Sequence, residues 1–147
     1  MSVLKDVKNK LAIATTVLPQ VAIGTTDLTG SAVDTQDSIG VALVAHVGLS
    51  GDTLSGSVKL EFEVQHSDAS GSGFAACADA DIDAAVTGTN TGTFAVVDAA
   101  AEDELVYKCN YLGNKRYVKV IANYTGTHTN GCPLGVVAVL LPTHLPA

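Results

Sequence analysis

Apolar and polar residues alternate over much of the chain. In the clearest stretch, "SVKLEFEVQHS" over residues 57–67, every second residue is apolar and the residues between are charged or polar. Successive side chains of a β-strand point to opposite faces, so this pattern predicts a strand with one buried face and one charged, solvated face. The predicted solvated face carries Lys59, Glu61, Glu63 and Gln65.

Three further stretches also predict strands. Residues 39–48 are apolar in both alternating phases, which is typical of a strand covered on both faces. Residues 104–124 hold two alternating runs around Leu112–Lys115, and this predicts a hairpin because Gly113 and Asn114 can adopt the positive φ of a tight turn. Residues 133–142 form a last strand with a proline at each end, where a missing N–H does least harm.

Loops rich in Gly, Ser, Thr, Asp and Asn separate these runs, and no long helical pattern alternates with them. The chain is therefore predicted to be all-β, an antiparallel β-sandwich of jelly-roll-like form. Short helical segments are predicted at 79–86 and 98–104, where acidic residues would complement a helix N-terminus. The polar, lysine-containing start predicts an N-terminal arm over residues 1–15, which leaves residues 16–147 as one sandwich domain.

Composition favours association with other protein molecules over catalysis. Hydrophobic residues make up 47% of the 147 residues and charged residues only 16%. A small domain of this kind has reason to bury additional surface against its own copies or a partner. The net charge of −7 opposes nucleic-acid binding, which normally needs a basic face. No apolar run of 18 residues occurs, so no membrane contact is predicted.

No pattern predicts catalytic residues, a metal site or a cofactor. Asp79, Asp81 and Asp83 are spaced like the start of a calcium loop, but Ala84 stands where that loop needs glycine. The twelfth position, which needs a bidentate acid, is Asn90. An acidic helix start or an exposed loop is the simpler interpretation.

The cysteines and histidines have no metal-ligand spacing. The three cysteines are expected to be reduced and buried, which indicates synthesis in a cytoplasm; they are Cys77, Cys109 and Cys132. His46 lies in an apolar run and His66 beside Asp68 at a strand end, and both are expected to be hydrogen-bonded structural residues.

Six of the eight basic residues fall into two groups. They are Lys5, Lys8 and Lys10 near the N-terminus, and Lys115, Arg116 and Lys119 beside the predicted turn. On an acidic protein, such groups can meet an acidic surface of a partner or of a neighbouring copy, and this hypothesis makes them candidate partner-binding residues. Lysines on an edge hairpin can equally prevent aggregation. The sequence leaves both interpretations open.

The segment "YLGNKRYV", Tyr111–Val118, resembles a motif of small proteins from the head genes of tailed bacteriophages and prophages. These proteins commonly share an aromatic-x-Gly-x-Lys-Arg-Tyr-Val segment, then a polar Gly/Thr loop, an apolar strand and a short Pro/His tail like residues 142–147. Residues 64–74, "VQHSDASGSGF", also resemble the group, which often has a Ser-Asp turn followed by an aromatic residue. The chain differs by a longer insertion at 75–103.

The resemblance implies a virion structural protein, specifically a capsid decoration (cement) protein. Such proteins are β-sandwiches or jelly rolls, often homotrimers, that bind the major capsid protein on the outer surface of an icosahedral head. The expected location is the capsid surface of a virion, after synthesis in the bacterial host cytoplasm. Alternatives are another virion component (tail-tube, neck or fibre-associated protein) and a carbohydrate- or host-surface-binding module. The shortage of aromatic residues argues against the latter.

Overall fold

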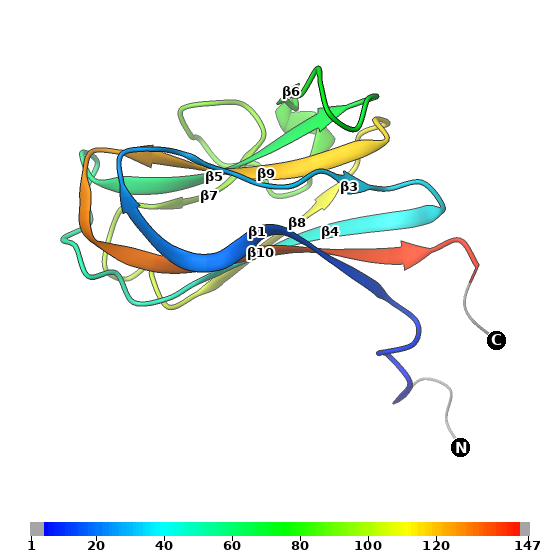
Figure 1. Cartoon of the computed structure of the whole chain (residues 1–147), viewed down its shortest axis with the longest axis horizontal. Coiled ribbons are helices and arrows are strands. Elements are labelled where there is room, and N and C mark those ends of the chain that lie inside the picture. Colours follow the sequence, from blue (N-terminus) through cyan, green and yellow to red (C-terminus); the bar gives the residue numbers. More distant parts are fainter. Residues whose placement is uncertain (1–4, 145–147) are drawn as a thin grey trace.

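Two antiparallel β-sheets pack face to face in the computed structural model, which describes residues 5–144 (Figure 1). Sheet A contains, in spatial order, β1 (Ala12–Gly24), β10 (His128–Pro142), β4 (Ser38–Val47) and β8 (Val106–Tyr111). Sheet B contains β2 (Leu28–Thr29), β9 (Tyr117–Thr125), β5 (Lys59–Ser67) and β6 (Ala75–Ala76), with β3 (Val33–Asp34) on β9 and β7 (Thr93–Val97) on β5. The predicted all-β antiparallel sandwich is confirmed, and the jelly-roll form stays a prediction.

The hydrophobic core lies between the two sheets. It is built from alternate residues of each strand, such as Leu43 and Ala45 of β4 and Leu60, Phe62 and Val64 of β5, all fully buried. The alternation in residues 57–67 therefore identified the inward face of β5 correctly.

All three cysteines are free and buried, as predicted. Burial raises the pKa of the Cys77 and Cys109 thiols to about 12 and that of Cys132 to about 11. The thiolate is the nucleophile and the metal ligand, so these side chains act as small core residues at neutral pH.

The predicted hairpin over 104–124 is wrong. β8 pairs with β4 in sheet A, whereas β9 pairs with β5 in sheet B, so residues 112–116 cross from one sheet to the other. Gly113 does not have a positive φ. A Cβ at Gly113 would lie 2.5 Å from the Tyr111 hydroxyl oxygen, so this glycine is needed for space. Alternation could not reveal the crossing, because a strand shows the same pattern whichever strand it pairs with.

Other predicted boundaries also shift. β1 begins at Ala12, so residues 12–15 of the predicted arm pair with β10 in sheet A. The predicted helices reduce to one 3-10 turn, η2 (Asp79–Asp81), and residues 98–104 contain turns without a helix. β10 begins at His128, which places Pro133 inside the strand. Pro133 is tolerated at the end of the β10–β4 ladder, where only its carbonyl is used and accepts from the Gly48 amide at 2.7 Å.

The predicted solvated face of β5 is wrong for Glu61 and Glu63, which are buried, whereas Lys59 and Gln65 are half-buried. Glu61 is 1% exposed and Glu63 is 2% exposed. Glu61 accepts hydrogen bonds from the Thr89 amide (2.8 Å) and hydroxyl (2.6 Å), and Glu63 accepts from the side-chain amides of Asn90 (2.5 Å) and Asn123 (2.7 Å). The insertion at 75–103 thus supplies part of the cover over the outer side of sheet B.

Candidate interface on the outer face of sheet A

The outer face of sheet A is mostly apolar, with the polar Thr15, Lys108 and Asn110 on its outer strands, and no segment among residues 5–144 covers it. The four strands of this sheet hold one charged residue, Lys108 on β8. Ile13 is 68% exposed and Val106 is 57% exposed. Residues 39–48 were predicted to be covered on both faces, and this prediction is wrong for the described chain. Only the inward face of β4 is buried, so its outward face is left to solvent or to a partner.

Strand register places the outward residues in continuous rows. Val139 of β10 lies opposite Ile13 of β1 on one side and Ala42 of β4 on the other. Two residues along, Val137 lies opposite Val44. Side chains alternate along β10, so these residues point away from the core. A contiguous apolar surface of this kind on one chain marks a site of contact with another macromolecule.

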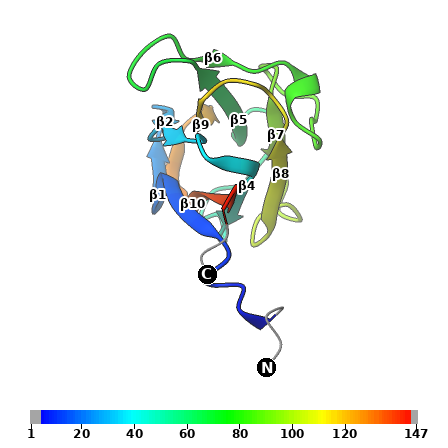
Figure 2. The same cartoon turned by 90° about the vertical axis from the view of Figure 1, so that its right-hand side faces the viewer.

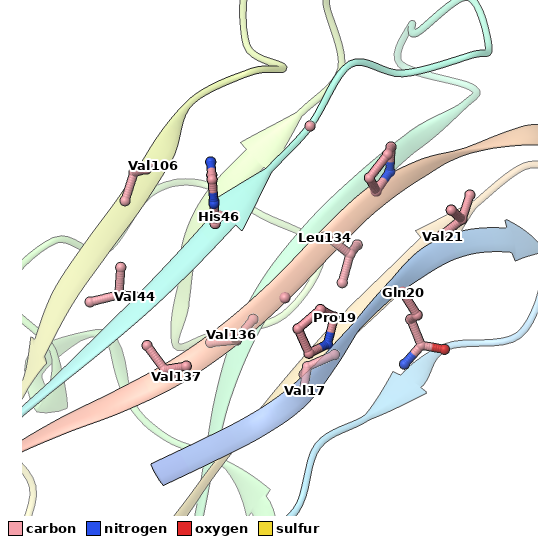
Figure 3. A pocket seen from close by; sticks show the side chains of 13 residues that line it. Val17, Pro19, Gln20, Val21, Val44, His46, Val106, Leu134, Val136 and Val137 are labelled. Carbon is pink, nitrogen blue, oxygen red and sulfur yellow. The ribbon is translucent and has the colours of Figure 1, made fainter. Parts of the chain in front are cut away.

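One end of this face is hollowed into an open groove of about 680 Å³ (Figure 3). Gly135 forms part of the groove floor. Pro19 of β1 packs against it, and a Cβ added at position 135 would lie only 3.2 Å from the Cα of Pro19. Most of the lining is hydrocarbon, including Val21 and Val44, and the polar lining side chains are Gln20 and His46.

His46 is exposed at this groove and has no hydrogen bond within residues 5–144, so the predicted structural role is wrong for His46. The same prediction is confirmed for His66, whose Nδ1 lies 2.8 Å from the Tyr111 hydroxyl.

An acidic loop borders the same groove. The Glu104 amide donates to the carbonyl of Gly48 at 3.3 Å, and Gly48 lines the groove. The loop, residues 98–104, contains four acidic residues and no basic one. Asp103 is buried and accepts from the Ser50 amide, and Glu102 accepts from two amides of its own loop. Glu104 is exposed, and its backbone contacts the rim of the groove at Gly48.

The basic residues at 115–119 have intramolecular partners, which the sequence did not reveal. Lys115 forms an ion pair with Asp68. Arg116 binds both carboxylate oxygens of Asp34, at 2.9 and 2.8 Å, and these bonds lower the pKa of Asp34 to about 2. The Lys119 ammonium lies 4.3 Å from the centroid of the Phe74 ring. Lys115 and Lys119 are thus directed to the loop between β5 and β6, and Arg116 to β3, and their role in binding a partner stays a prediction.

The N-terminal segment 5–11 leads away from the two sheets (Figures 1 and 2). It contains one turn, closed by a hydrogen bond from the Lys10 amide to the Val7 carbonyl at 3.0 Å. Lys5 and Lys8 are exposed, and Val7 is 57% exposed. This segment places two lysines and an apolar side chain outside the sandwich.

The three aspartates of the calcium-like spacing take separate hydrogen bonds. Asp79 accepts from the Gly92 amide, and Asp83 accepts from the amide and side chain of Asn110. Asp81 accepts from the amide of Ala78. Within residues 5–144 no cluster of three or more His, Cys, Asp or Glu side chains is placed to hold a metal ion. In the same residues, no helix has the length and apolar character needed to cross a membrane.

The sequence did not predict that His128 would be buried. His128 is fully buried, with Nε2 3.2 Å from the Lys59 carbonyl oxygen and Nδ1 3.9 Å from a carboxylate oxygen of Asp52. Its ring packs edge-on against Tyr124 at a centroid distance of 5.2 Å. Since it lies in a polar Thr/Gly segment of the sequence, no local pattern could have placed it in the interior.

Comparison of the chain with family models, with curated proteins and with solved structures finds no match in any of the three.

Proposed function

We propose that this chain is a virion structural protein that decorates the outer surface of an icosahedral phage head and stabilises it. The observation that carries the proposal is the asymmetry of the sandwich: the 75–103 insertion lies over part of the outer side of sheet B, whereas the outer face of sheet A is apolar and bare. A protein whose own chain leaves such a face uncovered is suited to permanent assembly with other protein molecules. The resemblance of Tyr111–Val118 to a segment of phage head proteins favours a phage capsid among such assemblies.

The mechanism is thermodynamic. A protein that binds the assembled shell and not the free subunits favours the shell by mass action, by about 2.7 kcal/mol at a concentration one hundred times its Kd. Attachment as a homotrimer would multiply modest single contacts through effective concentration. The partner in this proposal is the major capsid protein, and the exposed Lys5 and Lys8 are available to an acidic capsid surface.

The test adds purified protein to expanded heads that lack it, followed by cryo-electron microscopy and thermal disruption of the heads. We expect density at capsomer junctions and a raised disruption temperature. The Ile13→Asp variant places a charge on the bare face outside the groove and should abolish this binding. Val86→Asp is the control, because Val86 is also an exposed apolar residue (42% against 68% for Ile13) but lies in the loop region between β6 and β7.

Three results would overturn the proposal. They are heads without bound protein, a soluble ring of six or more copies as expected of a tail tube, and binding to a glycan in place of the head.

A further inference from the structure

We propose that the groove on sheet A is occupied by the N-terminal segment, residues 5–11, of a neighbouring copy of this chain. Copies would then associate by exchanging these arms. The inference rests on the proposed function, because it explains the self-association proposed there. It identifies the two surfaces in contact as the arm of one copy and the groove of the next.

The arm has the chemistry of a groove ligand. Val7 and Leu11 are four residues apart, and Val7 stands in solvent in the isolated chain. The segment contains three lysines and one aspartate, so its net charge is +2. The whole chain has a net charge of −7, so the rest of the chain has a net charge of −9. The arm and the body of another copy therefore attract each other, although two whole copies carry the same net sign.

The groove matches this segment in length and in charge. Its lining follows β10 from Pro133 to Val137, about 13 Å at the usual rise of a strand. Seven extended residues reach at most about 25 Å, so the arm can span the groove with part of its turn retained. The backbone of Glu104 contacts Gly48 at the rim, and in this proposal its exposed carboxylate pairs with an arm lysine.

The same geometry disfavours the arm of the same chain. That arm joins the body at Ala12, which pairs with Leu140, five residues or about 17 Å along β10 from Gly135. To enter its own groove it must reverse direction, and a β-turn takes four residues. The three residues that remain extend about 10 Å, which reaches only the near end of the groove at Val137 and falls short of the floor at Gly135.

Disulfide trapping in solution tests the exchange without any phage heads. Val7→Cys and Val137→Cys are made in separate chains that carry C-terminal tags of different size. They are then mixed and oxidised, and the three natural cysteines give little background because they are buried. We expect a covalent mixed dimer, at least tenfold more abundant than from Val7→Cys mixed with Val86→Cys. Equal yields from the two mixtures would overturn the proposal. So would a Val7→Cys/Val137→Cys double variant that links only within one chain.

A second measurement follows association by sedimentation. Removing residues 1–11 should convert oligomers to monomers while the circular dichroism of the sandwich is retained. Glu104→Gln should weaken association about two- to fivefold, the usual range for an exposed ion pair. If the truncated chain still forms oligomers of the original size, arm exchange is wrong. If the protein decorates heads but no mixed disulfide forms, arm exchange is wrong and the proposed decoration function stands. If a mixed disulfide forms but the heads stay undecorated, arm exchange stands and the decoration function is wrong.

Discussion

The Glu61→Gln substitution tests how the insertion is fastened to sheet B. Glu61 is 1% exposed, and its two carboxylate oxygens accept from the amide and the hydroxyl of Thr89, with the Lys59 ammonium 3.3 Å away. Hydrogen bonds to a charged group contribute about 1.5–3 kcal/mol, whereas neutral ones contribute about 0.5–1.5 kcal/mol. Glutamine keeps the shape but weakens both bonds, by roughly 1 kcal/mol each. Burying a neutral amide costs less free energy than burying a carboxylate, and this difference offsets part of the loss.

We therefore expect Glu61→Gln to lower the free energy of unfolding by about 1–2 kcal/mol at pH 7. For a domain of this size that corresponds to a fall in Tm of roughly 3–6 °C. Urea denaturation followed by circular dichroism measures the change. Glu104→Gln is the control at a protein concentration where the chain is monomeric, because it removes the same charge from an exposed site and should stay within about 0.5 kcal/mol of the wild type.

The pH dependence gives the sharper test. Burial alone would raise the pKa of Glu61, but the hydrogen bonds from Thr89 and the nearby Lys59 outweigh it, so its pKa lies below the ordinary value. A carboxylate with a lowered folded pKa contributes stability above the unfolded pKa and loses it as the pH falls through the folded value. The difference between wild type and Glu61→Gln should therefore shrink as the pH falls towards 3. A difference that is the same at pH 3 and pH 7, or no larger than that of Glu104→Gln, would refute the reasoning.

Three further predictions concern other parts of the fold. Gly113→Ala should destabilise the chain by about 1–3 kcal/mol in urea, because the new Cβ would lie 2.5 Å from the Tyr111 hydroxyl oxygen; an unchanged midpoint would mean that the crossing is not tightly packed. Tyr111→Phe should cost about 1–2 kcal/mol, since it removes contacts to His66 and to the Lys115 amide; a smaller loss than for Tyr117→Phe would contradict this. The three thiols should react with a thiol reagent at pH 8 only after unfolding, because burial raises their pKa values; rapid labelling of the folded chain would show that at least one is accessible.

Alternation along the sequence identified the strands better than their partners. It placed Leu60, Phe62 and Val64 in the core because a period of two is a property of each strand by itself. It could not show that β8 and β9 belong to different sheets, since pairing depends on where the chain turns. It also placed Glu61 in solvent, because its cover comes from Thr89, 28 residues along the chain.

The basic residues show the same limit in the candidate site. Lys115 and Arg116 stand together in sequence and suggested one positive patch, yet their partners Asp68 and Asp34 are 47 and 82 residues away. The groove on sheet A arises from strands distant in sequence, and its floor depends on a glycine at position 135 that no motif singles out. Neither feature could be found without the fold.

One mismatch between sequence and fold carries information of its own. Residues 39–48 have the composition of a strand covered on both faces, but among the described residues the chain covers only the face that carries Leu43 and Ala45. The outward Val44 and Ala42 have no role in the core, and an isolated, soluble sandwich would carry polar residues there, as an antiparallel sheet with one solvated face does. An apolar outer row on β4, continued by Val137 and by Val139, fits a strand whose second cover is another protein molecule.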